Sequence, residues 1–343
     1  MKSIRLAFMG DLTIPEMPQK VNIKTDSDYL YDFAVCNLEG SCKTNRPLRK
    51  LANLYNSPEA LETMMHKLGI RYVNLANNHV MDFGEKGLLR LMETLDDIRV
   101  QYFGAGRTYS EAMKPVLVSM NGVRLGLIGF SWKPIESVGA TQAKAGVALI
   151  PPENKLCDAV ADLRRDCDHV VVSFHWGYEY ERYPLPLHRK LAHAVVDAGA
   201  SVVIGHHPHV YQGAESYKGG IIYYSLGNFY MPRPQKSQAD VGIVPIVKFG
   251  PNSVQQLTVL HSVRDRPTET LVLLDSYDPQ PSIKDLSLML NADDVAYQRF
   301  FRSNRVRRKG LPVFTGSRMD TVRYAWLDAR SRIVRISVRL GLR

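Results

Sequence analysis

The sequence has few cysteines, and they form no recognisable framework. There are four in 343 residues, and none belongs to a CxxC pair. Disulfide-rich secreted domains and cysteine-ligated zinc sites usually contain closely spaced cysteines, so this spacing argues against both. We expect free thiols, in a reducing compartment, at Cys36, Cys42, Cys157 and Cys167.

Long hydrophobic runs are also missing. No stretch approaches the roughly 20 apolar residues that span a bilayer. The first residues, MKSIRLAFMGDL, lack the apolar core and the small-residue cleavage site of a signal peptide, and they predict a β-strand. We therefore expect a cytoplasmic protein that can lie at the inner face of the membrane.

Excess basic charge is absent from most of the chain. Residues 1–298 hold 31 basic and 32 acidic side chains, whereas residues 299–343 hold thirteen Lys or Arg and two Asp or Glu. We expect a main domain at 1–265 and a basic extension at 266–343 that packs partly on it. The extension predicts an anionic partner such as a membrane surface, and a solvated end is the alternative. The basic cluster at 305–309 lacks interleaved aromatic residues, which argues against nucleic acid.

Short apolar runs alternate with helical patterns along the chain. This alternation predicts an α/β fold whose sheet is buried on both faces. Strands are expected at 4–9, 33–38, 71–76, 123–130, 169–174, 201–204 and 221–225, helices at 57–68, 85–97 and 187–198, and a hairpin at 241–249 and 255–263.

Five of the expected strands end in side chains that can bind a metal ion. In open α/β sheets, ligands gather beyond the carboxyl ends of the strands. Each residue alone is a weak signal, because an Asp after a strand is usually a turn former or a helix cap. Together they predict one site, built from Asp11, Glu39, Asn78, His79, His175, His206, His207 and His209.

The mixture of carboxylate and imidazole groups suits a divalent transition metal. A bound ion can lower the pKa of a water molecule from about 15.7 toward about 7, and two ions about 3.5–4 Å apart can clamp the attacking and leaving oxygens. We therefore expect one or two divalent ions, with manganese, zinc and iron as candidates. A neighbouring histidine could serve as general acid.

Six motifs occur in a specific order: GD at 10–11, NLEG at 37–40, NNHxxDxG at 77–84, HWGxEY at 175–180, GHHPH at 205–209 and YSLGNF at 224–229. This set resembles the CapA family, which is named for poly-γ-glutamate capsule synthesis and is similar to the calcineurin-like metallophosphoesterases. The resemblance covers about the first two-thirds of the chain. It implies a four-layer α/β/β/α sandwich with the metal site at one end.

The resemblance also implies roles for individual residues. A first metal ion would be bound by Asp11 and His209, and Glu39 would bridge to a second ion. His79 would be the general acid beside the second ion. The ligands of that second ion would be Asn78, His175 and His207.

Two positions depart from the phosphoesterase pattern. Thr13 stands where those enzymes have a metal-binding histidine, and Glu39 stands where they have the shorter Asp. The first metal site could therefore be weak, differently filled or absent. A phosphatase reaction does not follow from the fold alone.

Several nearby residues allow two interpretations each. Asp82 could orient His79 or cap the following helix. His206 and Trp176 could contact substrate or be structural, and Asn228 could support the site or belong to a plain turn. The carboxylates Glu179 and Glu181 are interpreted as surface charge unless the pocket reaches them.

Three functions remain open from the sequence. The leading hypothesis is a metal-dependent hydrolase that cleaves a phosphoester or an amide of an anionic polymer or peptide, in capsule or poly-γ-glutamate synthesis. An epimerase that removes an α-proton at the same metal is the runner-up. The third is a non-catalytic component of a cell-envelope assembly that binds the polymer.

Overall fold

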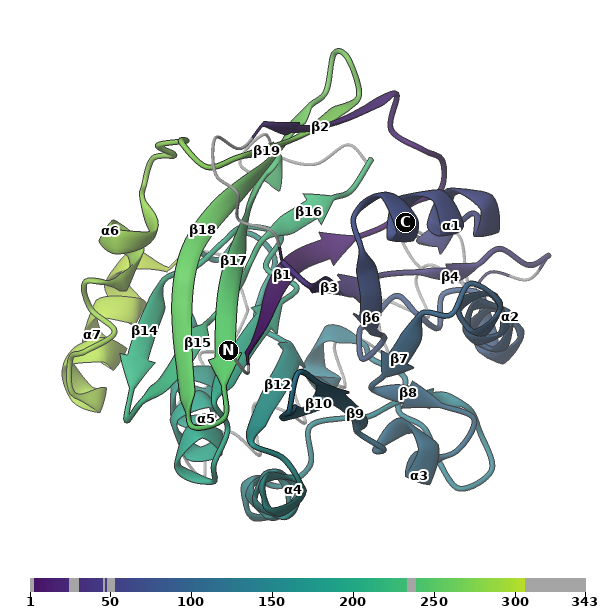
Figure 1. Cartoon of the computed structure of the whole chain (residues 1–343). Helices are drawn as coiled ribbons and strands as arrows, with labels where there is room; N and C mark the ends of the chain where they lie inside the picture. Colours follow the sequence, from purple (N-terminus) through teal and green to yellow (C-terminus); the bar gives the residue numbers. More distant parts are fainter. Residues whose placement is uncertain (1–2, 25–30, 46, 48–52, 233–238, 306–343) are drawn as a thin grey trace, which may run out of the picture.

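Two β-sheets pack face to face, and helices cover their outer faces (Figure 1). The computed structural model describes residues 3–24, 31–45, 47, 53–232 and 239–305. The expected four-layer α/β/β/α sandwich is confirmed, because separate hydrophobic cores lie between the two sheets and beneath the helices on either side.

The first sheet has nine strands and mixes parallel with antiparallel pairs. The predicted hairpin is confirmed as β17 and β18, which pair antiparallel. In spatial order the strands are β2 (Lys20–Lys24), β19 (Thr270–Leu274), β18 (Ser253–Asp265), β17 (Val241–Gly250), β1 (Ile4–Leu12), β3 (Phe33–Leu38), β6 (Ile70–Asn74) and β7 (Gln101–Phe103), and β16 (Asn228–Tyr230) pairs with β1.

The second sheet has six strands, and its central four run parallel. In spatial order its strands are β14 (Ala214–Tyr217), β15 (Gly220–Tyr223), β13 (Val202–His206), β12 (His169–His175), β10 (Val123–Ser131) and β9 (Val116–Met120). Helices α4 (Glu153–Asp166) and α5 (Pro186–Asp197) connect β10 to β12 and β12 to β13, as expected for crossover connections between parallel strands.

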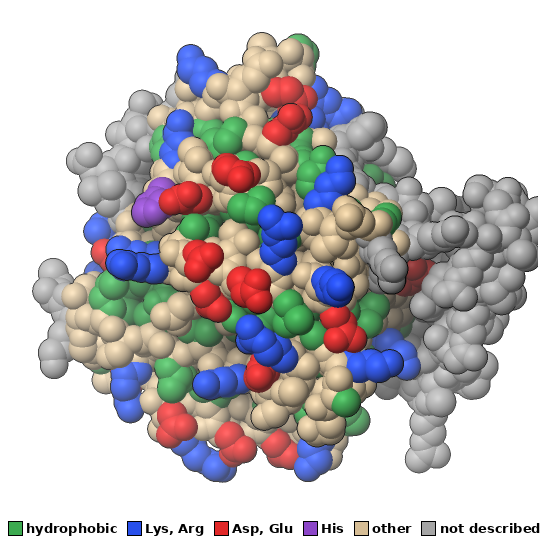
Figure 2. Space-filling view, turned by 90° about the vertical axis from the view of Figure 1, so that its right-hand side faces the viewer, with side chains coloured by type: hydrophobic (Ala, Val, Ile, Leu, Met, Phe, Trp, Pro, Cys, Tyr) green, Lys and Arg blue, Asp and Glu red, His purple; other side chains and the backbone are tan. Residues whose placement is uncertain are grey.

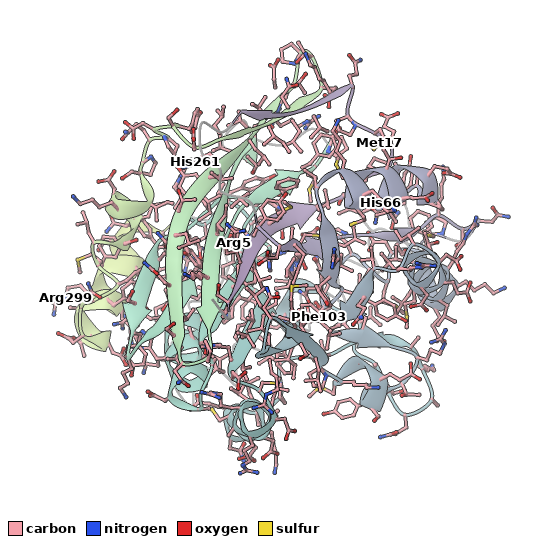
Figure 3. The ribbon with its side chains drawn as sticks, viewed as in Figure 1. Arg5, Met17, His66, Phe103, His261 and Arg299 are labelled. Atoms are coloured by element: carbon pink, nitrogen blue, oxygen red, sulfur yellow. The ribbon has the colours of Figure 1, made fainter. Side chains whose placement is uncertain are left out.

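Alternate side chains of each strand face different cores. In β1, Leu6 and Phe8 point into the core between the sheets, whereas Ala7 and Met9 point toward the helices. This follows from the two-residue period of a strand. Phe103 of β7, labelled in Figure 3, belongs to the core between the sheets.

The outer helices are amphipathic. Ser57 caps α1 (Pro58–Lys67), which packs with α2 (Gly84–Asp97) on the first sheet. On the second sheet lie α4 (Glu153–Asp166) and α5 (Pro186–Asp197). The remaining short elements are β4 (Ser41–Cys42), β5 (Tyr55–Asn56), β8 (Ala105–Gly106), α3 (Tyr109–Ala112), η1 (Lys133–Ile135) and β11 (Gly146–Val147).

The chain after residue 265 contributes to the fold as far as it is described. Strand β19 lies inside the first sheet, and α6 (Ile283–Ser287) and α7 (Asp294–Asn304) follow it. The buried Arg189 of α5 donates to the carbonyl oxygens of Leu290 and Ala292 and to Asp294, which ties α7 to α5. The last 38 residues of the predicted basic extension, 306–343, lie outside the described residues.

The described surface on the side of α1 and α2 carries both signs of charge. Figure 2 shows Lys and Arg side chains interspersed with Asp and Glu over this face. Within the described parts of the chain, no helix combines the length and apolarity that a membrane span requires.

Candidate metal centre

The parallel strands bring the predicted residues together at one edge. Strands β1 and β3 run parallel in the first sheet, and β12 and β13 run parallel in the second. Asp11 pairs with Asn37 of β3 and with Asn228 of β16, so β1 continues through Leu12. The predicted end of this strand at residue 9 is therefore wrong, because β16 supplies hydrogen-bonding partners beyond it.

Two glycines permit the close approach of backbone segments around the site. A Cβ atom on Gly10 would overlap the carbonyl oxygen of Gly227, and one on Gly205 would overlap that of Tyr224. Gly10 precedes Asp11 directly, and Gly205 precedes His206. The spacing of these site residues thus depends on positions that admit no side chain.

Asp11 is the centre of the polar network. Its Oδ1 accepts from Nδ2 of Asn37 (2.9 Å), and its Oδ2 accepts from the backbone N–H of His207 (3.1 Å). The Nδ1 atoms of His206 and His209 each lie 3.4 Å from its oxygens. Burial raises the pKa of Asp11, but the contacts with His206 and His209 outweigh burial and hold the pKa well below its usual value.

Glu39 follows β3 and is fully buried. Neither of its carboxylate oxygens has a hydrogen-bond partner among the described residues. Burial and the charge of Asp11 raise the pKa of Glu39 well above its usual value. A buried carboxylate in this state is costly unless a proton or a cation compensates it.

His175 ends β12 and lies between the two carboxylates and Asn78. One ligand atom each from Asp11, Glu39 and His175 lies within 4.8 Å of the others, close enough for one ion to reach all three. Nε2 of His175 is 2.9 Å from Oδ1 of Asn78 and 3.7 Å from Oε1 of Glu39. Burial and the neighbouring His207 lower the pKa of His175 well below its usual value, which favours the neutral form of the ring.

The histidine loop after β13 has strained backbone. His207 has φ +94° and His209 has φ +59°, a region that favours glycine. The adjoining loop is strained too, with Tyr180 at φ +62° and its N–H donating to the carbonyl oxygen of Pro208 (2.6 Å). Strain of this kind persists only where the surrounding structure determines it strongly, and it is typical of functional sites.

The charges on this loop differ between neighbours. Burial and the nearby His209 lower the pKa of His207 to about 3. Burial also disfavours protonated His209, but Asp11 and Glu39 outweigh it and raise its pKa to about 10. Nδ1 of His207 has no hydrogen-bond partner among the described residues.

His79 and Asp82 form a pair at the margin of the site. Nδ1 of His79 lies 2.7 Å from Oδ2 of Asp82. Helix α2 begins after Phe83 without a side-chain cap, so Asp82 faces His79 and does not cap the helix. The same carboxylate oxygen accepts from the backbone N–H of Leu54 (2.8 Å).

Trp176, a predicted substrate contact, and Thr13, which departs from the phosphoesterase pattern, both make structural contacts. The Trp176 ring is buried in the core, stacked between Phe174 and His188, and its Nε1–H donates to the carbonyl oxygen of Tyr224. The Trp176 ring therefore supports the histidine loop from the core side, and almost none of it is exposed for contact with a substrate. Thr13 donates to the carbonyl oxygen of Glu39 (3.3 Å), which supports the backbone of that residue.

Sequence reasoning missed two polar residues, Asn37 and Asn74, and interpreted a third, Glu179, as surface charge unless the pocket reaches it. Asn37 and Asn74 form a buried amide chain next to Asp11, although both lie inside expected strands. Glu179 is half-buried. Burial and Asp11 are the main causes of the raised pKa of Glu39, and the charge of Glu179 adds to them. The same charge also raises the pKa of His209. Its place in the HWGxEY motif was the one available signal for Glu179.

The donor set fits a divalent cation. Both carboxylate oxygens of Glu39 lack a hydrogen-bond partner in the described part of the chain, Asp11 lies beside it, and imidazole nitrogens converge on both residues. Oxygen and imidazole donors in this combination suit manganese, zinc or iron, and they do not select among them.

Comparisons with known proteins agree with the motifs. The family model described as "Bacterial capsule synthesis protein PGA_cap" matches residues 18–233. The chain is 37% identical to "Capsule biosynthesis protein CapA" of Bacillus anthracis over 71% of its own length and 63% of that protein. It is 29% identical to "PGA biosynthesis protein CapA" of Bacillus subtilis (strain 168) over 69% of its length and 66% of that protein. The chain thus spans about two-thirds of the length of these relatives.

Solved structures with a similar arrangement include two nucleotidases. The 5'-nucleotidase precursor from Thermus thermophilus is matched with a TM-score of 0.46 at 16% identity, over 76% of this chain and 54% of that one. The NAD nucleotidase of Haemophilus influenzae is matched with a TM-score of 0.47 at 10% identity, over 97% and 60%. The family assignment rests on the sequence matches: this chain belongs to the bacterial capsule synthesis protein family PGA_cap.

Proposed function

We propose that this protein is a divalent-metal-dependent hydrolase that acts on an amide or phosphoester of an anionic polymer or peptide during capsule or poly-γ-glutamate synthesis. The names of its CapA relatives support the process. The observation that carries the chemistry is the fully buried Glu39 carboxylate, which has no hydrogen-bond partner among the described residues and faces Asp11 and the histidines.

Residues of both sheets would hold the ion. Asp11 and Glu39 come from β1 and the end of β3, and His209 comes from the loop after β13. When bound, a divalent ion supplies a water molecule of lowered pKa and polarises the oxygen of the bond to be cleaved. His175 lies within reach of the same space, and its part is derived in the next subsection.

His79 would transfer the proton to the leaving group. Asp82 accepts from its Nδ1, so the exchangeable proton is at Nε2. The buried carboxylate holds the ring in one orientation and favours its protonated form. His79 is partly exposed at the margin of an otherwise buried cluster, and this supports a role in which its ring meets the substrate.

Reconstitution with manganese in water enriched in oxygen-18 tests this proposal. The substrates are a γ-linked glutamate oligomer and bis-p-nitrophenyl phosphate. Metal-dependent incorporation of oxygen-18 into a cleaved product supports the hydrolase. Deuterium uptake at a substrate α-carbon in heavy water would point to an epimerase instead, and tight polymer binding without turnover would point to a binding component.

A further inference from the structure

The ring of His175 has an amide group beside each nitrogen. Nδ1 lies 3.2 Å from Nδ2 of Asn37, and Nε2 lies 2.9 Å from Oδ1 of Asn78. All three side chains are buried. The orientation of these amides therefore determines which nitrogen of the neutral ring carries the proton.

The orientation of the Asn37 amide is determined at both ends of a hydrogen-bonded chain. The backbone N–H of Ala76 donates to Oδ1 of Asn74 (3.1 Å), so Asn74 offers its Nδ2 to Oδ1 of Asn37 (3.0 Å). Nδ2 of Asn37 then donates to Oδ1 of Asp11 (2.9 Å), and an ionised carboxylate can only accept. If the Asn37 amide were reversed, its oxygen would face the carboxylate of Asp11, and its NH2 group would face the NH2 group of Asn74.

Asn37 thus presents an N–H group to Nδ1 of His175. That nitrogen must accept, so the neutral ring carries its proton at Nε2 and donates to Oδ1 of Asn78. A histidine that binds a metal through one nitrogen almost always donates N–H from the other to a carboxylate, a carbonyl or water. His175 has this arrangement reversed, because its second nitrogen faces a donor.

His209 has the arrangement of a ligand. Its Nδ1 lies 2.9 Å from Oδ1 of Asn228 and 3.4 Å from Oδ2 of Asp11, two acceptors. Nδ2 of Asn228 donates to the carbonyl oxygen of Ala239 (2.9 Å), which keeps the amide oxygen toward His209. Nδ1 of His209 therefore carries a proton, and Nε2 is the nitrogen available to an ion.

We infer that these two histidines have different roles: His209 binds the metal through Nε2, whereas His175 is a hydrogen-bond donor through Nε2–H. Asn37 is the positioning residue that sets the proton of His175. In this role the Nε2–H group of His175 donates to the Asn78 side chain and holds it in place. The same Nε2 atom lies 3.7 Å from Oε1 of Glu39. The ligand role of His209 rests on the proposed function, but the proton position in His175 does not.

Nitrogen-15 NMR of histidine-labelled protein tests this directly, in the metal-free and the zinc-loaded states. Signals are assigned with His175→Gln and His209→Gln, or through the backbone if a variant does not fold. His169 is an internal reference, since its Nε2 lies 2.6 Å from the carbonyl oxygen of Gly250 and must carry a proton. We expect Nε2–H at His175 in both states. A proton at Nδ1, or zinc at Nε2 of His175, would overturn the inference.

A matched pair of variants gives a second readout in zinc affinity, measured by calorimetry. His175→Gln keeps an N–H donor, so we expect at most the roughly 10- to 100-fold loss typical of a residue outside the ligand set. His209→Gln should lose more. Equal losses, or the reverse order, would contradict the inference. If the wild type binds no zinc, the proposed function fails, and the metal-free spectrum still decides where the proton of His175 lies.

Discussion

Nδ1 of His79 lies 2.7 Å from Oδ2 of Asp82, and the carboxylate is fully buried whereas the imidazole side chain is 14% exposed. The exposed partner can meet a substrate, and the buried partner can only orient and charge it. This division of roles is expected of a general acid and its supporting carboxylate.

The first prediction concerns this pair. His79→Gln should lower kcat by about 10²- to 10⁴-fold, because the leaving group loses its proton donor. Asp82→Asn should lower kcat less, by about 10- to 100-fold, because the ring remains but loses its orienting charge. The measurement is manganese-dependent release of p-nitroaniline from a γ-glutamyl anilide. The exposed Glu93→Gln on α2 is the control, and wild-type rates in Asp82→Asn would refute the assignment.

The second prediction is that Glu39→Gln weakens metal binding and raises the stability of the metal-free protein. In metal-free protein the variant should melt above the wild type, because a neutral amide is cheaper to bury than an unpartnered carboxylate. Manganese at about 100 times its Kd should stabilise the wild type by about 2.7 kcal/mol. The variant should gain much less in differential scanning calorimetry, and an equal gain in both would show that Glu39 does not hold the ion.

The third prediction is a pH dependence from His188, which stacks on Trp176. Burial lowers its pKa from 6.5 to about 3 in the folded protein. Below pH 6.5 this histidine is protonated in the unfolded chain but stays neutral in the folded protein. The free energy of unfolding therefore falls by up to about 1.4 kcal/mol per pH unit as the pH is lowered to about 3. His188→Phe should remove this part of the slope in urea unfolding between pH 6.5 and 4. An unchanged slope would mean that His188 titrates normally in the fold.

The fourth prediction concerns the approach of backbones beside Asp11. Gly10→Ala should cost about 1–3 kcal/mol or more, because the added methyl overlaps the carbonyl oxygen of Gly227. Gly84→Asn is the matched control: Gly84 has φ +69° and nothing within 4 Å of an added Cβ, and Asn tolerates that conformation. Urea unfolding should separate the two. Similar losses would show that the crossing at Gly10 relaxes easily.

Hydrophobic periodicity was sufficient to predict the central strands of both sheets and the helices α1, α2 and α5. In α2 the expected apolar face is confirmed, since Leu88, Leu91, Met92 and Leu95 are all buried. Helix α4 was not predicted, because only Leu156, Val160 and Leu163 are buried in a largely polar segment. Its helical pattern is clear only once α5 and the second sheet supply a surface to pack on.

The site could be predicted as a gathering of strand ends, but not as a hydrogen-bond network. Asp11, Glu39 and His175 converge because parallel strands bring their carboxyl ends to one edge. Asn37 and Asn74 gave no separate signal, because their pairing depends on the register between β3 and β6. Local patterns carry no information about which amide atom faces which ring nitrogen.

Metal content per chain is the most direct test of the account. It would be measured by plasma mass spectrometry, after purification without chelator, on the wild type, Glu39→Gln and His209→Gln. We predict at least one manganese, zinc or iron ion in the wild type and a clear loss in both variants. A wild type that holds no metal even after reconstitution, or variants that hold as much as the wild type, would contradict the metal centre proposed for this protein.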